Sequence, residues 1–135
     1  MALMVWDNSF SVNVKEIDSQ HQRLIALIND LHDAMKTGKA KDVLGKILSG
    51  LTDYTVYHFG VEEKLFQTHG YPEAVQHKRE HDALTKQVLD IKKKFEEGKT
   101  GVTVEMMAFL KDWLTNHIMK TDKKYTPFLN GNGVV

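Results

Sequence analysis

The stretch DSQHQRLIALINDLHDAMKTG, residues 18–38, has the spacing of an amphipathic helix. Asp18 is a suitable N-cap, because its carboxylate can accept hydrogen bonds from the free amides of the first turn. Gly38 suits the left-handed position that ends many helices. The apolar side chains recur every three or four positions and would share one face of a helix over residues 18–37: Leu24, Ile25, Ile28, Leu31 and Met35.

Three further segments toward the C-terminus repeat this spacing and predict helices over about 41–67, 72–97 and 102–120. Pro72 suits a first helical turn, and we expect the fourth helix to end before Pro127. The connections are short, which favours antiparallel neighbours. The sequence therefore predicts an all-α fold, an up-down-up-down four-helix bundle.

The chain ends lack this pattern. Residues 1–17 alternate weakly between apolar and polar positions without a partner strand, so we expect an extended N-terminal arm. Residues 127–135 predict a frayed tail. The 135 residues together have the size of one domain.

The composition excludes several classes of function. Lys plus Arg and Asp plus Glu number 18 each, so the formal net charge is zero and no basic run points to nucleic acid. No apolar run reaches the roughly 18 residues that span a bilayer. The opening MALMVWD lacks the charged and apolar regions of a signal peptide. We therefore expect a cytoplasmic domain that contacts neither nucleic acid nor membrane.

The chain contains no cysteine, which excludes disulfides, thiolate nucleophiles and iron–sulfur clusters. A metal site would have to use histidine and oxygen ligands. Five of the seven histidines fall near helix ends that the predicted bundle brings to one end of the molecule: His21, His58, His77, His81 and His117.

Two carboxylates accompany these histidines. Glu62 follows His58 by four residues and would lie on the same helical face. Asp122 follows His117 by five residues, which is about 140° around an ideal helix. The fourth helix must therefore bend, widen or end between them if both are to face inward.

Seven ligands are too many for one tetrahedral zinc ion and suit two metal ions bridged by the carboxylates. Two divalent ions, two carboxylates and a bridging hydroxide would leave a net charge near +1, which a bundle interior can tolerate. Imidazole with carboxylate favours iron, copper or zinc over calcium or magnesium.

The segment HKREH, residues 77–81, also matches the inverted motif of zinc metalloproteases, with His77 and His81 on zinc and Glu80 as the base. That alternative leaves the other histidines unexplained. A ferritin-like di-iron oxidase is a second alternative, but that class is richer in carboxylates and uses Glu-x-x-His pairs.

The sequence resembles the hemerythrin family, in its bacterial hemerythrin-like type. The resemblance covers nearly the whole chain and rests on QHQRL at His21, HFGVE at His58, HKREH at His77 and HIMKTD at His117, in that order. Trp6, ahead of VNVKEID, also fits the family. The four motifs together are highly specific, whereas each alone would be weak.

The resemblance implies reversible O2 binding at a non-haem di-iron site, without enzymatic activity beyond a weak consumption of peroxide. Glu62, Asp122 and an oxo or hydroxo group would bridge the irons. The iron with fewer ligands would offer O2 an open position. The terminal ligands would be His77, His81 and His117 on one iron, and His21 and His58 on the other.

The walls of an O2 pocket should be apolar. Leu114 and Ile118 are the better candidates, because the family has an apolar residue at the position matching Leu114, whereas Trp113 is first a core residue. Tyr125 matches the family and would contact the ligands or cap the bundle. We expect Glu80 to face solvent. His32 and His69 are expected to be ordinary surface or packing residues.

The biological role stays open between an O2 carrier, an O2 or redox sensor, and a protein that handles iron or nitric oxide. A sensor would be fused to, or partnered with, a signalling module. The sequence does not determine the oligomeric state.

Overall fold

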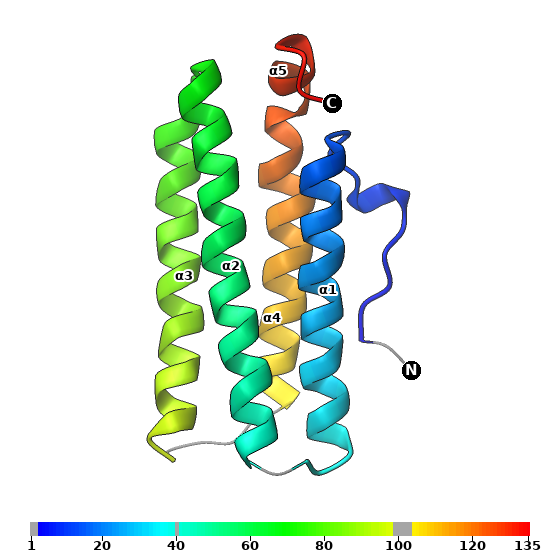
Figure 1. Ribbon diagram of the computed structural model, residues 1–135, viewed down its shortest axis with the longest axis vertical. Coiled ribbons are helices and arrows are strands. Elements are labelled where there is room, and N and C mark those ends of the chain that lie inside the picture. Colours follow the sequence, from blue (N-terminus) through cyan, green and yellow to red (C-terminus); the bar gives the residue numbers. More distant parts are fainter. Residues whose placement is uncertain (1–2, 40, 99–103) are drawn as a thin grey trace.

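The computed structural model describes residues 3–39, 41–98 and 104–135. Four long helices lie side by side along the long axis, with neighbours antiparallel (Figure 1). They are α1 (Lys15–Lys36), α2 (Lys41–His69), α3 (Ala74–Glu96) and α4 (Val104–Asn116). The predicted all-α, up-down-up-down bundle is confirmed.

The fourth helix continues beyond Asn116. A π-helical turn (His117–Thr121) and a 3-10 turn (Asp122–Tyr125) lead into the short helix α5 (Thr126–Gly131). The expected start of the fourth helix near Val102 lies outside the described residues.

Helix α1 begins three residues earlier than expected, and Asp18 is not its N-cap. The Asp18 carboxylate instead accepts hydrogen bonds from the Ser11 hydroxyl at 2.6 Å and the Val12 amide at 2.8 Å. It therefore ties the arm to α1. The first turn is stabilised by packing, because Val14 and Ile17 are buried.

Glycines end α1 and α2 as their positions suggest. Gly38 and Gly70 have φ values of 67° and 71°, which favour a residue without a Cβ atom. Pro72 lies in the turn between α2 and α3, two residues before α3 begins, rather than in its first turn.

The C-terminal segment is not a frayed tail. Pro127 lies in the first turn of α5, where its missing N–H is no loss, so it continues the chain into a helix rather than ending one. Leu129 is fully buried. The Thr126 hydroxyl donates to the Val12 carbonyl at 2.8 Å, which ties the C-terminal segment to the N-terminal arm.

The N-terminal arm runs along α1, with one 3-10 turn at Asn8–Phe10. The Asn29 side chain pairs with both backbone groups of Met4, each at 2.9 Å. Val12 is fully buried. The arm is therefore part of the core and covers a side of α1 that would otherwise expose apolar surface.

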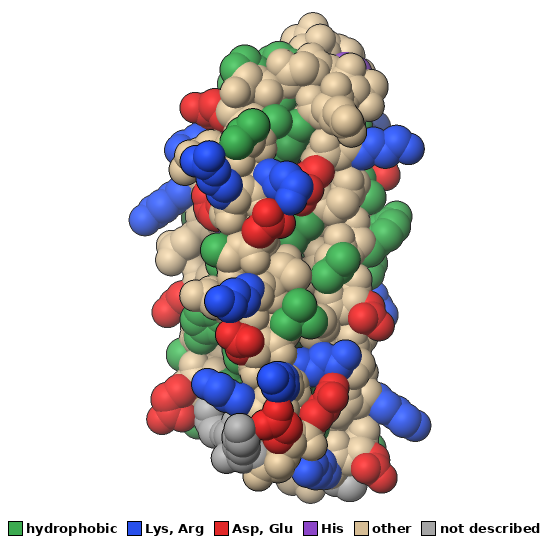
Figure 2. Space-filling model, turned by 90° about the vertical axis from the view of Figure 1, so that its left-hand side faces the viewer, with side chains coloured by type: hydrophobic (Ala, Val, Ile, Leu, Met, Phe, Trp, Pro, Cys, Tyr) green, Lys and Arg blue, Asp and Glu red, His purple; other side chains and the backbone are tan. Residues whose placement is uncertain are grey.

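Charged side chains of both signs are interspersed over the face drawn in Figure 2. Some form pairs along a helix, such as Lys78 with Asp82 at 2.9 Å. Within the described part of the chain, none of the helices combines the length and the hydrophobicity that a membrane span requires.

Candidate metal centre

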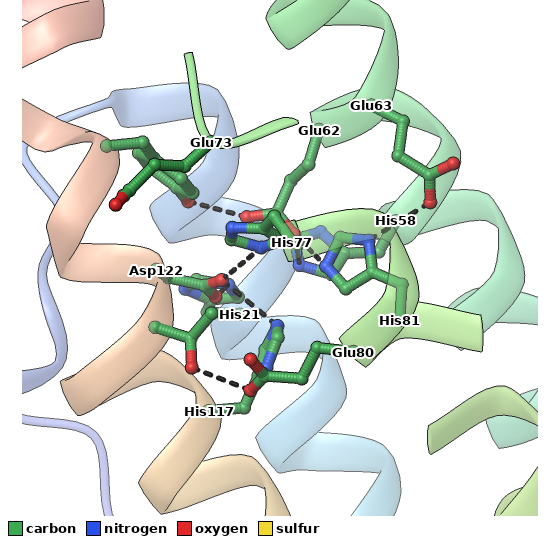
Figure 3. A network of polar contacts seen from close by, with 12 residues as sticks. His21, His58, Glu62, Glu63, Glu73, His77, Glu80, His81, His117 and Asp122 are labelled. Atoms are coloured by element: carbon green, nitrogen blue, oxygen red, sulfur yellow. Dashed lines mark hydrogen bonds and ion pairs between the residues drawn. The ribbon is translucent and has the colours of Figure 1, made fainter. Parts of the chain in front are cut away.

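The seven side chains singled out as metal ligands lie together inside the bundle, near the end where α1 and α3 begin (Figure 3). All are buried, with at most 3% of each exposed. They come from α1, α2, α3 and the two turns that follow α4: His21, His58, Glu62, His77, His81, His117 and Asp122.

Their donor atoms form two overlapping groups, and within each group the atoms lie within 4.8 Å of one another. Both groups contain Glu62 and Asp122. One group adds His77, His81 and His117, and the other adds His21 and His58.

The shared carboxylates face both groups. Asp122 Oδ1 lies 3.0 Å from His77 Nε2, and its Oδ2 lies 3.1 Å from His21 Nε2. Glu62 Oε1 lies 3.4 Å from His58 Nε2 and 3.2 Å from His81 Nε2. Each carboxylate is therefore placed between the two sets of imidazoles.

The π-helical turn brings His117 and Asp122 onto the same face. The Asp122 amide donates to the carbonyl of His117, five residues earlier, so this turn is wider than an α-helical one. As a result Asp122 Oδ1 lies 3.0 Å from His117 Nε2. The sequence predicts that the fourth helix bends, widens or ends between these residues, and in the structure it widens.

The cluster leaves its donor atoms without hydrogen bonds. Among the described residues, Nε2 of all five histidines, Oε1 of Glu62 and both oxygens of Asp122 are buried and have no hydrogen-bond partner. Buried polar atoms without partners are costly, and native proteins rarely keep them. These are also the atoms that coordinate metals, so the residues fit a pair of bound cations.

The other imidazole nitrogen of three cluster histidines does have a partner. His58 Nδ1 donates to Gln20 Oε1 at 2.7 Å. His81 Nδ1 lies 3.0 Å from Glu63 Oε2. Such bonds fix the ring orientation and direct Nε2 toward the centre. Nothing in the sequence pattern singled out Gln20 or Glu63.

The sequence predicts that Glu80 faces solvent, but in the structure its carboxylate also makes two hydrogen bonds. Its Oε1 accepts hydrogen bonds from His117 Nδ1 at 3.0 Å and from the Thr121 hydroxyl at 2.6 Å, while 37% of the side chain stays exposed. Residue spacing on α3 gave the outward direction correctly but missed that the turn after α4 lies against this flank. The rule that ligating histidines donate to carboxylates would have identified it.

Burial and the neighbouring charges shift the pKa values of several side chains in and around the cluster. Burial lowers the pKa of His58 to about 4, and the Glu62 carboxylate only partly opposes this, so His58 is a neutral donor. At His117 burial also disfavours the charged form, but the carboxylates of Asp122 and Glu80 outweigh it and raise the pKa to about 10. The hydrogen bond from His117 lowers the pKa of Glu80 to about 2, against a smaller effect of burial.

A family profile described as the hemerythrin HHE cation binding domain matches residues 12–129. The chain belongs to the hemerythrin family. A bacteriohemerythrin of Methylococcus capsulatus is 43% identical over 131 residues, which are 96% of this chain and 99% of the relative. A hemerythrin-like protein of Naegleria gruberi is 36% identical over 120 residues, 89% of this chain and 88% of the relative. A crystal structure of wild-type hemerythrin has a TM-score of 0.89 and 42% identity, and covers 93% of this chain and 97% of its own.

Aromatic and apolar residues surround the cluster of this hemerythrin. Leu114, Ile118 and Trp113, expected near the site, are all buried. Phe59, which the sequence did not single out, stacks on the His81 ring with centroids 3.9 Å apart and an angle of 7° between the planes. It also meets the edge of Trp113 at 6.2 Å. The cluster is therefore enclosed by hydrocarbon on this side.

Tyr125 contacts a candidate ligand directly. Its hydroxyl donates to Glu62 Oε2 at 2.6 Å, and the side chain is fully buried.

His32 and His69 belong to neither group of possible ligands. The zinc-protease alternative fits poorly in this hemerythrin, because Glu80 is engaged by His117 and Thr121 rather than free to act as a base.

Proposed function

We propose that this chain binds O2 reversibly at a di-iron centre built from the seven clustered side chains. The observation that carries the proposal is the pair of overlapping, buried donor groups, whose coordinating atoms have no hydrogen-bond partner among the described residues. Five imidazoles and two carboxylates suit iron in an HHE cation binding domain.

His77, His81 and His117 would hold one iron, and His21 and His58 the other. Asp122 would bridge them, because it presents one oxygen to each set of histidines. Glu62 would be the second protein bridge, and an oxo or hydroxo group the third. When bound there, two irons would supply the electrons that reversible O2 binding needs.

The residues around the cluster restrict access. Leu114 and Ile118, with Trp113 behind them, would form the walls of the O2 pocket, because all are buried in the segment that carries His117. An apolar wall excludes water and so opposes side reactions of a bound oxygen species. The proposed activity is therefore binding, not catalysis, with at most a weak consumption of peroxide.

The donor set also separates this function from its alternatives. Ferritin-like oxidases use carboxylate-rich sites, whereas this cluster has five imidazoles and two carboxylates.

The same site would serve three biological roles: carrying O2, sensing O2 or redox state beside a signalling module, and handling iron or nitric oxide. We propose the O2-binding step that the first two roles share.

The test is to purify the protein in air, count iron per chain and record its visible spectrum before and after dithionite and fresh O2. Two irons, with bands that disappear on reduction and return with O2, are expected. The variant His58→Ala should lose iron, whereas His69→Ala, on the same helix but outside both groups, should keep two irons. A colourless protein with one zinc would refute the proposal.

A further inference from the structure

The imidazoles of the two donor groups differ in the residues that lie behind them, on the Nδ1 side of each ring. We use "three-histidine half" for His77, His81 and His117, and "two-histidine half" for His21 and His58. In each half the Nε2 atoms face the centre, so any tuning must come through Nδ1.

Carboxylates stand behind the three-histidine half. Glu63 Oε2 lies 3.0 Å from His81 Nδ1, and Glu80 Oε1 lies 3.0 Å from His117 Nδ1 (Figure 3). Both carboxylates are partly exposed, by 28% and 37%, so water can solvate their outer sides.

No carboxylate stands behind the two-histidine half in the described part of the chain. His58 Nδ1 meets the neutral amide oxygen of Gln20 at 2.7 Å. His21 Nδ1 is buried without a hydrogen-bond partner among the described residues. Gln20 itself is only 6% exposed, where an added charge would be costly.

This difference has a chemical consequence. A hydrogen bond to a charged acceptor is roughly twice as strong as one between neutral groups. A carboxylate behind a ligating imidazole draws on the Nδ1 proton and makes Nε2 a stronger electron donor. Two imidazoles of one half are strengthened in this way, and neither imidazole of the other half is.

We propose that Glu63 and Glu80 are positioning residues that make the three-histidine half bind its iron more tightly and hold it electron-rich, while Gln20 leaves the two-histidine half weak. The inference rests on the proposed di-iron centre. It predicts that iron enters the three-histidine half first and leaves it last. The difference in affinity between the halves should exceed the difference that one additional histidine ligand alone would give.

The test is an anaerobic titration of metal-free protein with Fe(II) against a competing chelator, fitted as two binding steps. Glu63→Gln and Glu80→Gln keep an acceptor oxygen and remove its charge. Each should weaken the first step about tenfold and leave the second nearly unchanged, because partners of this kind are worth about 10–100-fold in metal affinity. The iron-loaded variants should also have a more positive reduction potential, which a purely structural role would not produce.

Glu73→Gln is the matched control. Glu73 lines the same small pocket as Glu80, but its Oε2 accepts from the Tyr71 hydroxyl at 3.0 Å instead of from a histidine. It should leave both steps unchanged. Gln20→Glu should act in the opposite sense and strengthen the second step. If that buried change prevents folding, the two partly exposed glutamates carry the test.

The inference is overturned if Glu63→Gln and Glu80→Gln leave the first step unchanged, weaken both steps equally, or match the effect of Glu73→Gln. These outcomes differ from a failure of the proposed function. A wild-type protein that takes up fewer than two irons refutes the di-iron centre itself, whatever the variants do.

Discussion

Tyr125→Phe isolates the hydrogen bond between the last helical turns and the cluster. The Tyr125 hydroxyl donates to Glu62 Oε2 at 2.6 Å, and both side chains are fully buried. Burial and the nearby Glu62 and Asp122 carboxylates hold the pKa of Tyr125 well above its usual value, so the hydroxyl remains a donor. Phenylalanine fills the same space without the oxygen.

The cost follows from the acceptor's charge. A hydrogen bond to an ionised group contributes about 1.5–3 kcal/mol, because its loss leaves a buried carboxylate oxygen unsatisfied. The free energy of unfolding of the metal-free protein should fall by that amount. For a chain of this length the melting temperature should fall by roughly 5–12 °C.

The assay is urea unfolding followed by circular dichroism. Metal-free protein is required, because bound metal stabilises the native state by mass action and obscures the difference. Tyr57→Phe is the control: that side chain is 57% exposed, and the change should stay within about 0.5 kcal/mol. A Tyr125→Phe variant as stable as this control would refute the idea that the hydrogen bond holds Glu62 in place.

Three further predictions concern the same region. Inserting one alanine after Lys120, which is exposed, should place the Asp122 carboxylate six residues after His117, about 240° around an ideal helix, and reduce bound iron below two per chain, whereas Lys120→Ala should keep both irons. Leu114→Ala should lower the free energy of unfolding by about 2–5 kcal/mol in urea and shorten the lifetime of the oxygenated spectrum, while Leu89→Ala, at a position 45% exposed, should do neither. The raised pKa of His117 stabilises the metal-free fold fully below pH 6.5, and that contribution is lost as the pH rises through about 10, so urea midpoints should fall across this range and fall less in His117→Gln.

Much of the fold and site follows from the sequence, because both depend on periodicity. Helical spacing predicts four helices, and short connections bring their alternate ends together, so the convergence of the histidines could be anticipated. A departure from a regular helix was predictable here too, since His117 and Asp122 are five residues apart and an α-helix cannot present both to one point, but the form of that departure was not.

The wrong predictions of helix ends and caps occur where a tertiary contact overrides a local sequence signal. Residues 127–135 suggested a frayed tail, yet Pro127 lies in the first turn of α5, because Leu129 finds a buried position against the bundle. Asp18 suggested an N-cap, yet its carboxylate binds the arm. Such partners depend on which segment folds over which flank, and residue spacing along one helix carries no information about that.

The sequence did not predict the residues that contact the ligands, for a related reason. Gln20, Glu63 and Phe59 contact the cluster only because of how α1, α2 and α3 are rotated about their own axes. Periodicity gives the buried face of a helix but not which neighbour each residue on its border meets. Glu80 was likewise expected to face solvent, but the turn after α4 lies against this flank of α3 and brings His117 and Thr121 to its carboxylate.

The burial of the donor atoms has a consequence for how the protein acquires its metal. None of the seven side chains is more than 3% exposed, so incoming iron meets no preformed open site. Loading must wait for a local opening of the fold, or take place before the chain has finished folding. The rate at which newly made protein matures is then set by how often the helices part, and not by the supply of iron once that supply is ample. The same closure delays the escape of iron after it has entered.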